Sequence, residues 1–362
     1  MSQLVQPIKS EDFLTKLKKV IAKNVKIVPS LTTMVLFIVA FVIGGIIWGD
    51  AGFFSLRNFF SLFTDNAHLL ISAMGMTFII ISGGIDLSVG SVAALSTMII
   101  ATGNAFEHGP ELAGWGWPMW LCIVVALVAG TLLGFIMGVL IQFFEVPPFI
   151  ATLAGMFFAR GLCFIISVNS IPIEDPGFRA IGAWNIQIRD ILNFNNPNAP
   201  VRVITIGVLL FLILLVFSII MMRSTKFGRN VYAIGGNEQS AKLMGLPVGK
   251  TRIFAYTFNG FCSALAGVAF AFSLNSGFGR HLIGMELDVI ASVVIGGALL
   301  SGGIGYPLGS VFGVLTHGTI RKYVSFGAIR AGYSRIIVGV ILLLFVIMQR
   351  VVVTIAEKNK EA

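Results

Sequence analysis

The chain has 362 residues, of which 56% are hydrophobic and only 11% are charged, and its formal net charge is +9. Soluble globular domains carry roughly 25% charged residues, so this composition excludes a soluble enzyme, a nucleic-acid-binding domain and a disordered protein. It predicts a polytopic membrane protein, because each bilayer span needs about 20 apolar residues. The excess of Lys and Arg is then typical of cytoplasmic segments, and we expect no nucleic-acid partner.

The chain begins with a basic, polar tail over residues 1–30, and the first apolar run, 31–48, follows it. No small-residue cleavage site comes after this run, which therefore predicts a retained span rather than a signal peptide. Nine further spans are predicted near 66–82, 87–105, 119–144, 149–168, 203–222, 253–274, 288–300, 303–320 and 336–354. The expected fold is an all-α polytopic membrane protein of about ten transmembrane helices. A single transmembrane domain would cover 31–354, with a short C-terminal tail over 355–362.

An even number of spans places both termini on one side of the membrane. If that side is the cytoplasm, the inside segments hold fifteen Lys and Arg and the outside loops hold eight. The loop 223–252 is strongly basic, which favours a cytoplasmic position, whereas the basic loop 321–335 would fall outside. We therefore expect a multi-pass inner-membrane protein with cytoplasmic termini, and the side of loop 321–335 stays open.

Two distant segments of the chain share a short internal repeat. Ser82-Gly-Gly-Ile85 recurs as Ser301-Gly-Gly-Ile304, and Gly90-Ser-Val92 recurs as Gly309-Ser-Val311, both at an offset of 219 residues. Each copy interrupts an apolar segment with glycines, which permit non-helical backbone. Such backbone is tolerated at membrane depth only where protein covers it or a cavity adjoins it. The repeat predicts two pseudo-symmetric halves whose central helices are broken along a substrate pathway.

Charged residues inside apolar segments are costly, at roughly 2.5–3.5 kcal/mol for an Asp at a helix centre in lipid. Asp86 lies in the first break, where it could cap the next helix together with Ser88 or contact a solute. Arg160 is predicted to make an ion pair or a carbonyl contact within the bundle, and Asp86 is one candidate partner.

Polar side chains and aromatic faces in the apolar segments suit a sugar, although each residue singly is also compatible with ordinary helix packing. The candidates for the translocation pathway are Ser82, Asp86, Ser88, Thr152, Phe157, Arg160, Asn259 and Ser292.

The loop 223–252 contains a segment that looks like a nucleotide-binding motif but is not one, and a candidate docking segment. Gly245-Leu-Pro-Val-Gly249-Lys250-Thr251 has three residues between its glycines, whereas a phosphate-binding P-loop needs four. We therefore predict no nucleotide site, no cofactor and no enzymatic activity, so a partner would supply any ATP hydrolysis. The stretch Glu238-Gln-Ser-Ala241-Lys-Leu-Met-Gly245 predicts a short amphipathic helix that could enter a groove on a soluble partner.

These segments carry a family resemblance. The run Gly75-Met-Thr-Phe-Ile-Ile-Ile-Ser-Gly-Gly-Ile-Asp-Leu-Ser-Val-Gly-Ser91 resembles the signature of permease subunits of bacterial ABC sugar importers, in the ribose, arabinose, xylose and galactofuranose branch. Further similarity covers 147–155, 232–237 and 286–297, and extends over nearly the whole chain from about residue 30. The stretches 155–161 and 170–173 look most similar to the permease of the galactofuranose importer.

The resemblance implies a ten-span permease that pairs with a second copy or a sister permease. It also implies an ABC ATPase on the cytoplasmic side and a periplasmic sugar-binding protein on the other side. The substrate would be a monosaccharide, and the permease itself would be surrounded by membrane lipid. The segment 237–246 would be the helix that couples to the ATPase, with Glu238, Ala241 and Gly245 as the coupling residues. The long N-terminal tail and the basic loop 321–335 depart from the family pattern.

Two other functions are compatible with the residues alone. An ion-coupled secondary transporter would use Asp86 to carry a proton or sodium ion. A membrane-embedded enzyme would need His, Asp or Glu clustered near one membrane face, which the sequence does not suggest.

Overall fold

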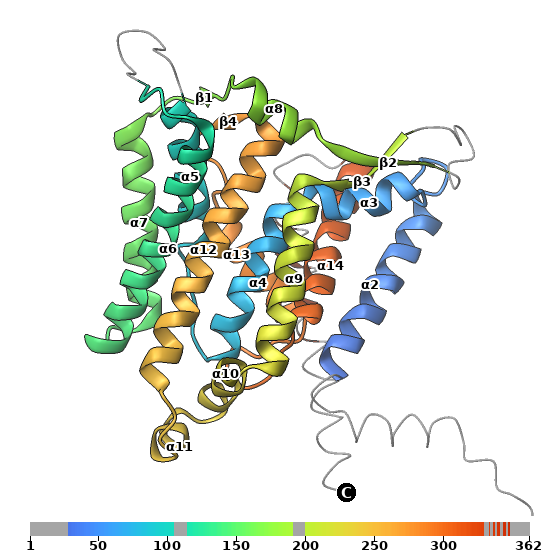
Figure 1. Ribbon diagram of the computed structural model, residues 1–362. Coiled ribbons are helices and arrows are strands. Elements are labelled where there is room, and N and C mark those ends of the chain that lie inside the picture. The colour runs from blue at the N-terminus through green and yellow to red at the C-terminus, as the bar shows by residue number, and fades with distance from the viewer. Residues whose placement is uncertain are drawn as a thin grey trace, which may run out of the picture.

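The computed structural model describes residues 28–104, 114–190 and 200–328, together with seven helical positions between 333 and 347. The chain forms a bundle of helices, with two short strand pairs at one end and the small helices α10 and α11 at the other (Figure 1). We call these the strand end and the α11 end. Most of the predicted N-terminal tail and tenth span, and all of the tail 355–362, lie outside the described residues.

The elements follow one another along the chain in this order. The helices are α2 (Val28–Ile47), α3 (Leu56–Asp65), α4 (Ala67–Ile81), α5 (Val89–Asn104), α6 (Met119–Phe143), α7 (Pro148–Ile166), α8 (Pro176–Ala183), α9 (Ile206–Ser224), α10 (Lys226–Gly236), α11 (Glu238–Leu243), α12 (Val248–Leu274), α13 (Met285–Ile295) and α14 (Pro307–Phe326). The strands are β1 (Ile171–Pro172), β2 (Asn185–Arg189), β3 (Pro200–Thr205) and β4 (Ser276–Gly277).

Five of the described helices are long and apolar enough to cross a membrane, namely α2, α6, α7, α9 and α12. The pair α3 and α4, bent by 55° at Asn66, gives a sixth if it is counted as one span. The other described segments that we predicted as spans correspond to α5, α13 and α14, which do not meet that criterion. Because α13 has 11 residues, it rises only about 16 Å, roughly half of a bilayer core. The prediction of ten spans in two halves stays a prediction.

The helix α12 lies at the centre of the bundle, where it packs against α4, α5 and α6. Gly260 of α12 faces Gly134 of α6, so that an added Cβ at Gly260 would lie 2.9 Å from the Gly134 Cα atom. Small residues let the two backbones touch, which is a typical way for helices to associate in lipid. On the outer helices the exposed side chains are apolar, as Ile46 of α2 and Ile165 of α7 illustrate.

The strand pairs were not part of the all-α prediction. β1 pairs antiparallel with β4, and β2 pairs antiparallel with β3. β2 reads Asn185-Ile-Gln-Ile-Arg189, an alternation of polar and apolar residues that is a strand signal we did not use. The strands β1, β2 and β3 and the helix α8 all lie between Ile171 and Thr205, mostly in the stretch between the predicted spans 149–168 and 203–222.

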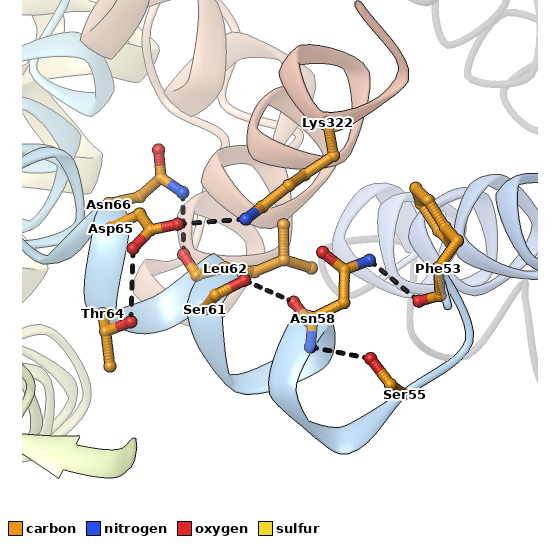
Figure 2. Close-up of polar contacts among 9 residues, drawn as sticks. All are labelled: Phe53, Ser55, Asn58, Ser61, Leu62, Thr64, Asp65, Asn66 and Lys322. Carbon is orange, nitrogen blue, oxygen red and sulfur yellow. Dashed lines mark hydrogen bonds and ion pairs between the residues drawn. The ribbon is translucent and has the colours of Figure 1, made fainter. Parts of the chain in front are cut away.

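The helix α3 lies at the strand end, where polar contacts fix it (Figure 2). Ser55 caps its first turn by accepting a hydrogen bond from the Asn58 amide, and the Asn58 side chain donates to the Phe53 carbonyl oxygen. At its other end Asp65 forms an ion pair of 3.0 Å with Lys322 of α14. Lys322 therefore has a local counter-ion at the strand end.

Arg321, the neighbour of Lys322, forms an ion pair of 2.7 Å with Asp288 of α13. Two cations of the basic loop 321–335 thus lie opposite the α11 end with their charges paired.

Candidate functional site

The two glycine breaks predicted from the repeat are present and lie next to each other. Residues 82–88 separate α4 from α5, and residues 296–306 separate α13 from α14. The Gly303 amide donates a hydrogen bond of 2.8 Å to the Ile81 carbonyl oxygen, which joins the two breaks. The matched positions Gly83 and Gly302 both have positive φ, at 82° and 86°, a conformation that favours glycine. The repeat therefore encodes two sharp turns that meet in space.

The end of α10 is fastened to the same place. Gly235 lies so close to both breaks that an added Cβ would overlap the Ile81 carbonyl oxygen and lie 2.5 Å from the Gly303 nitrogen. On the same helix, the Tyr232 hydroxyl donates a hydrogen bond of 2.7 Å to the Gly305 carbonyl oxygen. Movement of α10 would consequently be transmitted to both breaks.

Asp86 is buried and its carboxylate accepts three hydrogen bonds. One oxygen accepts from the Ser88 amide at 2.8 Å and from the Ser88 hydroxyl at 2.7 Å, and the other accepts from the Asn259 side chain at 2.8 Å. The two contacts with Ser88 form an Asx-type turn directly before α5 begins at Val89. The contact with Asn259 adds a link from the first break to α12.

Arg160 lies in α7 and holds a different part of the chain. Its guanidinium donates to the carbonyl oxygens of Gly279 and His281, at 2.6 and 2.8 Å. This is the carbonyl contact that we allowed for, and it fixes the loop that leads into α13. The structure does not pair Arg160 with Asp86, so that candidate pairing is wrong.

A polar cavity of about 770 Å³ opens beside the first break at the α11 end. Ser82, Gly84 and Tyr256 line it from the break and from α12, while Gln142 and Asn237 line it from α6 and the start of α11. The Tyr256 hydroxyl also donates to the Ile85 carbonyl oxygen at 3.2 Å. Of the predicted pathway residues, only Ser82 lines this cavity, while Asp86, Ser88 and Asn259 are buried next to the break.

The other predicted pathway residues lie elsewhere. Thr152 is buried and its hydroxyl donates to the Pro148 carbonyl oxygen at 2.8 Å, as in ordinary helix packing. Ser292 is buried in α13. Phe157 is 65% exposed on the outside of α7. Together with Arg160, these residues do not line the polar cavity.

The predicted short helix exists as α11 and is tied to the bundle by charge. Asn237 caps it by accepting from the Ser240 amide at 2.8 Å. Glu238 forms ion pairs with Lys242, at 2.8 Å, and with Arg252 of α12. Burial alone would raise the pKa of Glu238, but the hydrogen bonds and charges of Lys242 and Arg252 outweigh it and hold the pKa below its ordinary 4.5.

The three predicted coupling residues differ in what they can touch. Ala241 is buried against Ile234 and Val248, so its side chain anchors α11 rather than facing outward. Gly245 has a φ of 73° and open space around it. Leu243 and Met244, which we did not predict as coupling residues, are 89% and 67% exposed at the end of α11. The available signal was an apolar pair that ends a short polar helix before Gly245.

Comparison with known proteins places this architecture in a family. Residues 58–346 match the family described as the permease component of the branched-chain amino acid transport system. The chain belongs to this permease family. The permease is 40% identical over 314 residues to an inner membrane ABC transporter permease protein of Escherichia coli K12, covering 86% of this chain and 89% of the relative.

Two further relatives are named for sugars. A fructose import permease protein of Bifidobacterium longum is 36% identical over 335 residues, covering 92% of this chain and 94% of the relative. A ribose import permease protein of Bacillus subtilis is 34% identical over 349 residues, covering 95% of this chain and 99% of the relative. No solved structure matches the permease. The predicted resemblance to permeases of ABC sugar importers is confirmed, while the resemblance to the galactofuranose importer stays a prediction.

Proposed function

We propose that the chain is the transmembrane permease subunit of an ATP-binding-cassette importer that carries a monosaccharide across the cytoplasmic membrane. The substrate would be galactofuranose or another pentose or hexose. Family membership and the sugar importers among the relatives support this proposal. The observation that carries the mechanism is the junction of both glycine breaks with α10, next to a polar cavity and α11.

In this proposal the α11 end faces the cytoplasm, together with both termini, and the strand end faces the periplasm. The ATPase would dock on the exposed apolar pair Leu243 and Met244, with Gly245 giving it room. The periplasmic sugar-binding protein would dock at the strand end. A second copy of the chain, or a sister permease, would complete the pathway. The chain itself would need no cofactor, because ATP hydrolysis would take place in the separate ATPase.

The gating step follows from the contacts. Closure of the ATPase dimer would move α11 and α10, and Gly235 and Tyr232 would pass this movement to both breaks. Asp86 keeps the start of α5 tied to α12 through Asn259, so the first break would move with these two helices. The permease needs only that its two states differ in affinity for its partners.

The ion-coupled alternative assigns a carrier role to Asp86. Both of its carboxylate oxygens are engaged by neighbouring donors, which supports a positioning role instead. Uptake by the chain alone that an uncoupler and Asp86→Asn both abolish would favour the alternative.

The proposal is tested by purifying the tagged chain from its native membrane in mild detergent and identifying its partners by mass. We expect a P-loop ATPase, and ATP-dependent sugar uptake when the complex is reconstituted. Gly245→Arg should abolish co-purification of the ATPase. Gly52→Arg is a matched control, because Gly52 also has positive φ (79°) and open space but lies between α2 and α3, away from α11 in the chain. Recovery of an active chain without an ATPase would overturn the proposal.

A further inference from the structure

A second cavity, of about 690 Å³, lies at the α11 end on the side of α10 toward α2. The first turns of α2, the end of α9, α10 and the second break surround it. Its described walls are mainly apolar, with Leu31, Met34, Met222, Leu308 and Phe312 among the lining side chains. Its chemistry therefore differs from that of the polar cavity beside the first break.

Two arginines line this apolar cavity. Arg223 comes from the last turn of α9 and Arg229 from α10, and both are exposed. Neither of them forms an ion pair with another residue in the described part of the chain. An apolar chamber with two free guanidinium groups at one rim suits a ligand that has an acyl chain and an anionic head.

We propose that this cavity binds an anionic phospholipid of the cytoplasmic leaflet. The phosphodiester would lie between Arg223 and Arg229, since guanidinium groups bind phosphate oxygens with paired, charge-assisted hydrogen bonds. One acyl chain would occupy the apolar chamber. This proposal rests on the proposed function in one respect only, namely the cytoplasmic orientation of the α11 end.

Charge argues against the N-terminal tail as the occupant. Residues 1–27 carry six Lys against Glu11 and Asp12, so the tail and the two arginines have the same sign. An anionic lipid is complementary to both and would be attracted by them together.

Bound lipid would contact and stabilise the second break. The cavity is lined by Gly303, Gly305 and Tyr232, and these same residues connect the break to Ile81 and to α10. Lipid in the cavity would thus contact the element that the gating step has to move.

The test measures lipid retention on the full-length chain in mild detergent by native mass spectrometry. The probes are palmitoyl-oleoyl phosphatidylglycerol, the phosphatidylcholine with the same chains, and inorganic phosphate. We expect retention of phosphatidylglycerol to exceed that of phosphatidylcholine about tenfold, and Arg223→Gln with Arg229→Gln to remove this preference. The control is Lys226→Gln with Lys250→Gln, which removes the same charge from exposed residues of the same loop and should preserve it.

Filling the chamber separates lipid binding from simple anion binding. Leu308→Trp keeps both arginines and should lower phosphatidylglycerol retention, and millimolar phosphate should not displace the lipid from the unmodified chain. Equal retention of both lipids, equal effects of the arginine and lysine pairs, or displacement by phosphate would overturn the proposal. Retention that appears only after deletion of residues 2–20 would show that the tail fills the cavity, and would overturn it too. These readouts require no transport, so ATP-dependent uptake can succeed while the lipid site fails.

Discussion

Replacing Gly235 with alanine tests the junction of α10 with the two breaks. The new methyl group would overlap the Ile81 carbonyl oxygen and lie 2.5 Å from the Gly303 nitrogen, so the three backbones must separate. Overpacking of this kind costs about 1–3 kcal/mol. Separation also breaks the 2.8 Å hydrogen bond from Gly303 to Ile81, which adds about 1–3 kcal/mol for buried groups left unpaired. We expect a total destabilisation of about 2–6 kcal/mol.

The matched control is Gly236→Ala, one residue further along the same helix, where an added Cβ has no neighbour within 4 Å. The assay is thermal unfolding of both purified variants, followed by intrinsic fluorescence in the same detergent. We expect Gly235→Ala to unfold on the order of 5 °C or more below Gly236→Ala, which should match the unmodified chain. Equal midpoints for the two variants would refute the contact between α10 and the breaks.

Three further predictions concern α11 and α7. Leu243→Ala should weaken ATPase binding roughly 30-fold, or about 2 kcal/mol, because this exposed side chain would be buried on docking. Leu132→Ala, on the exposed side of α6, should leave the Kd unchanged, and equal affinities would contradict docking through α11. The pKa of Glu238 is lowered in the folded chain by its two cationic partners. The ionised Glu238 therefore stabilises the fold at any pH above the pKa that this residue has in the unfolded chain. This stabilisation is lost as the pH falls through the lower pKa of the folded chain. A spin label on Met244→Cys should therefore become more mobile once the pH is low enough to protonate Glu238, and in Glu238→Gln already at pH 7; a label with pH-independent mobility would contradict this. Arg160→Ala should accelerate hydrogen exchange in the loop before α13 about tenfold or more, because two hydrogen bonds to a charged group are lost, and unchanged exchange would show that they do not order the loop.

Much of the architecture could be predicted because membrane spans are encoded locally. Long apolar runs predicted α2, α6, α7, α9 and α12, since a bilayer requires about 20 apolar residues and internal hydrogen bonds. The repeat predicted two glycine breaks, because positive φ is a local property of the residue. Asp86 and Ser88 lie two residues apart, so their turn could also be read from the sequence.

Contacts between distant segments could not be predicted in this way. Asn259 reaches Asp86 across 173 residues, and Arg160 finds carbonyl oxygens more than a hundred residues away. Ala241 looked like a docking residue, but the packing of α11 buries it and exposes Leu243 instead. A short helix has no fixed inward face until it packs, and a shift of one residue turns its buried face by about 100°.

The sequence by itself determined that this chain is a membrane permease with two broken segments and a short polar helix in a basic loop. Composition, span length and glycine position act locally, so they leave a direct record in the order of residues. Only the tertiary structure decided that both breaks meet α10 at Gly235, and that two arginines border an apolar cavity. Such contacts depend on how helices pack against one another, and the spacing of residues along the chain does not record that arrangement.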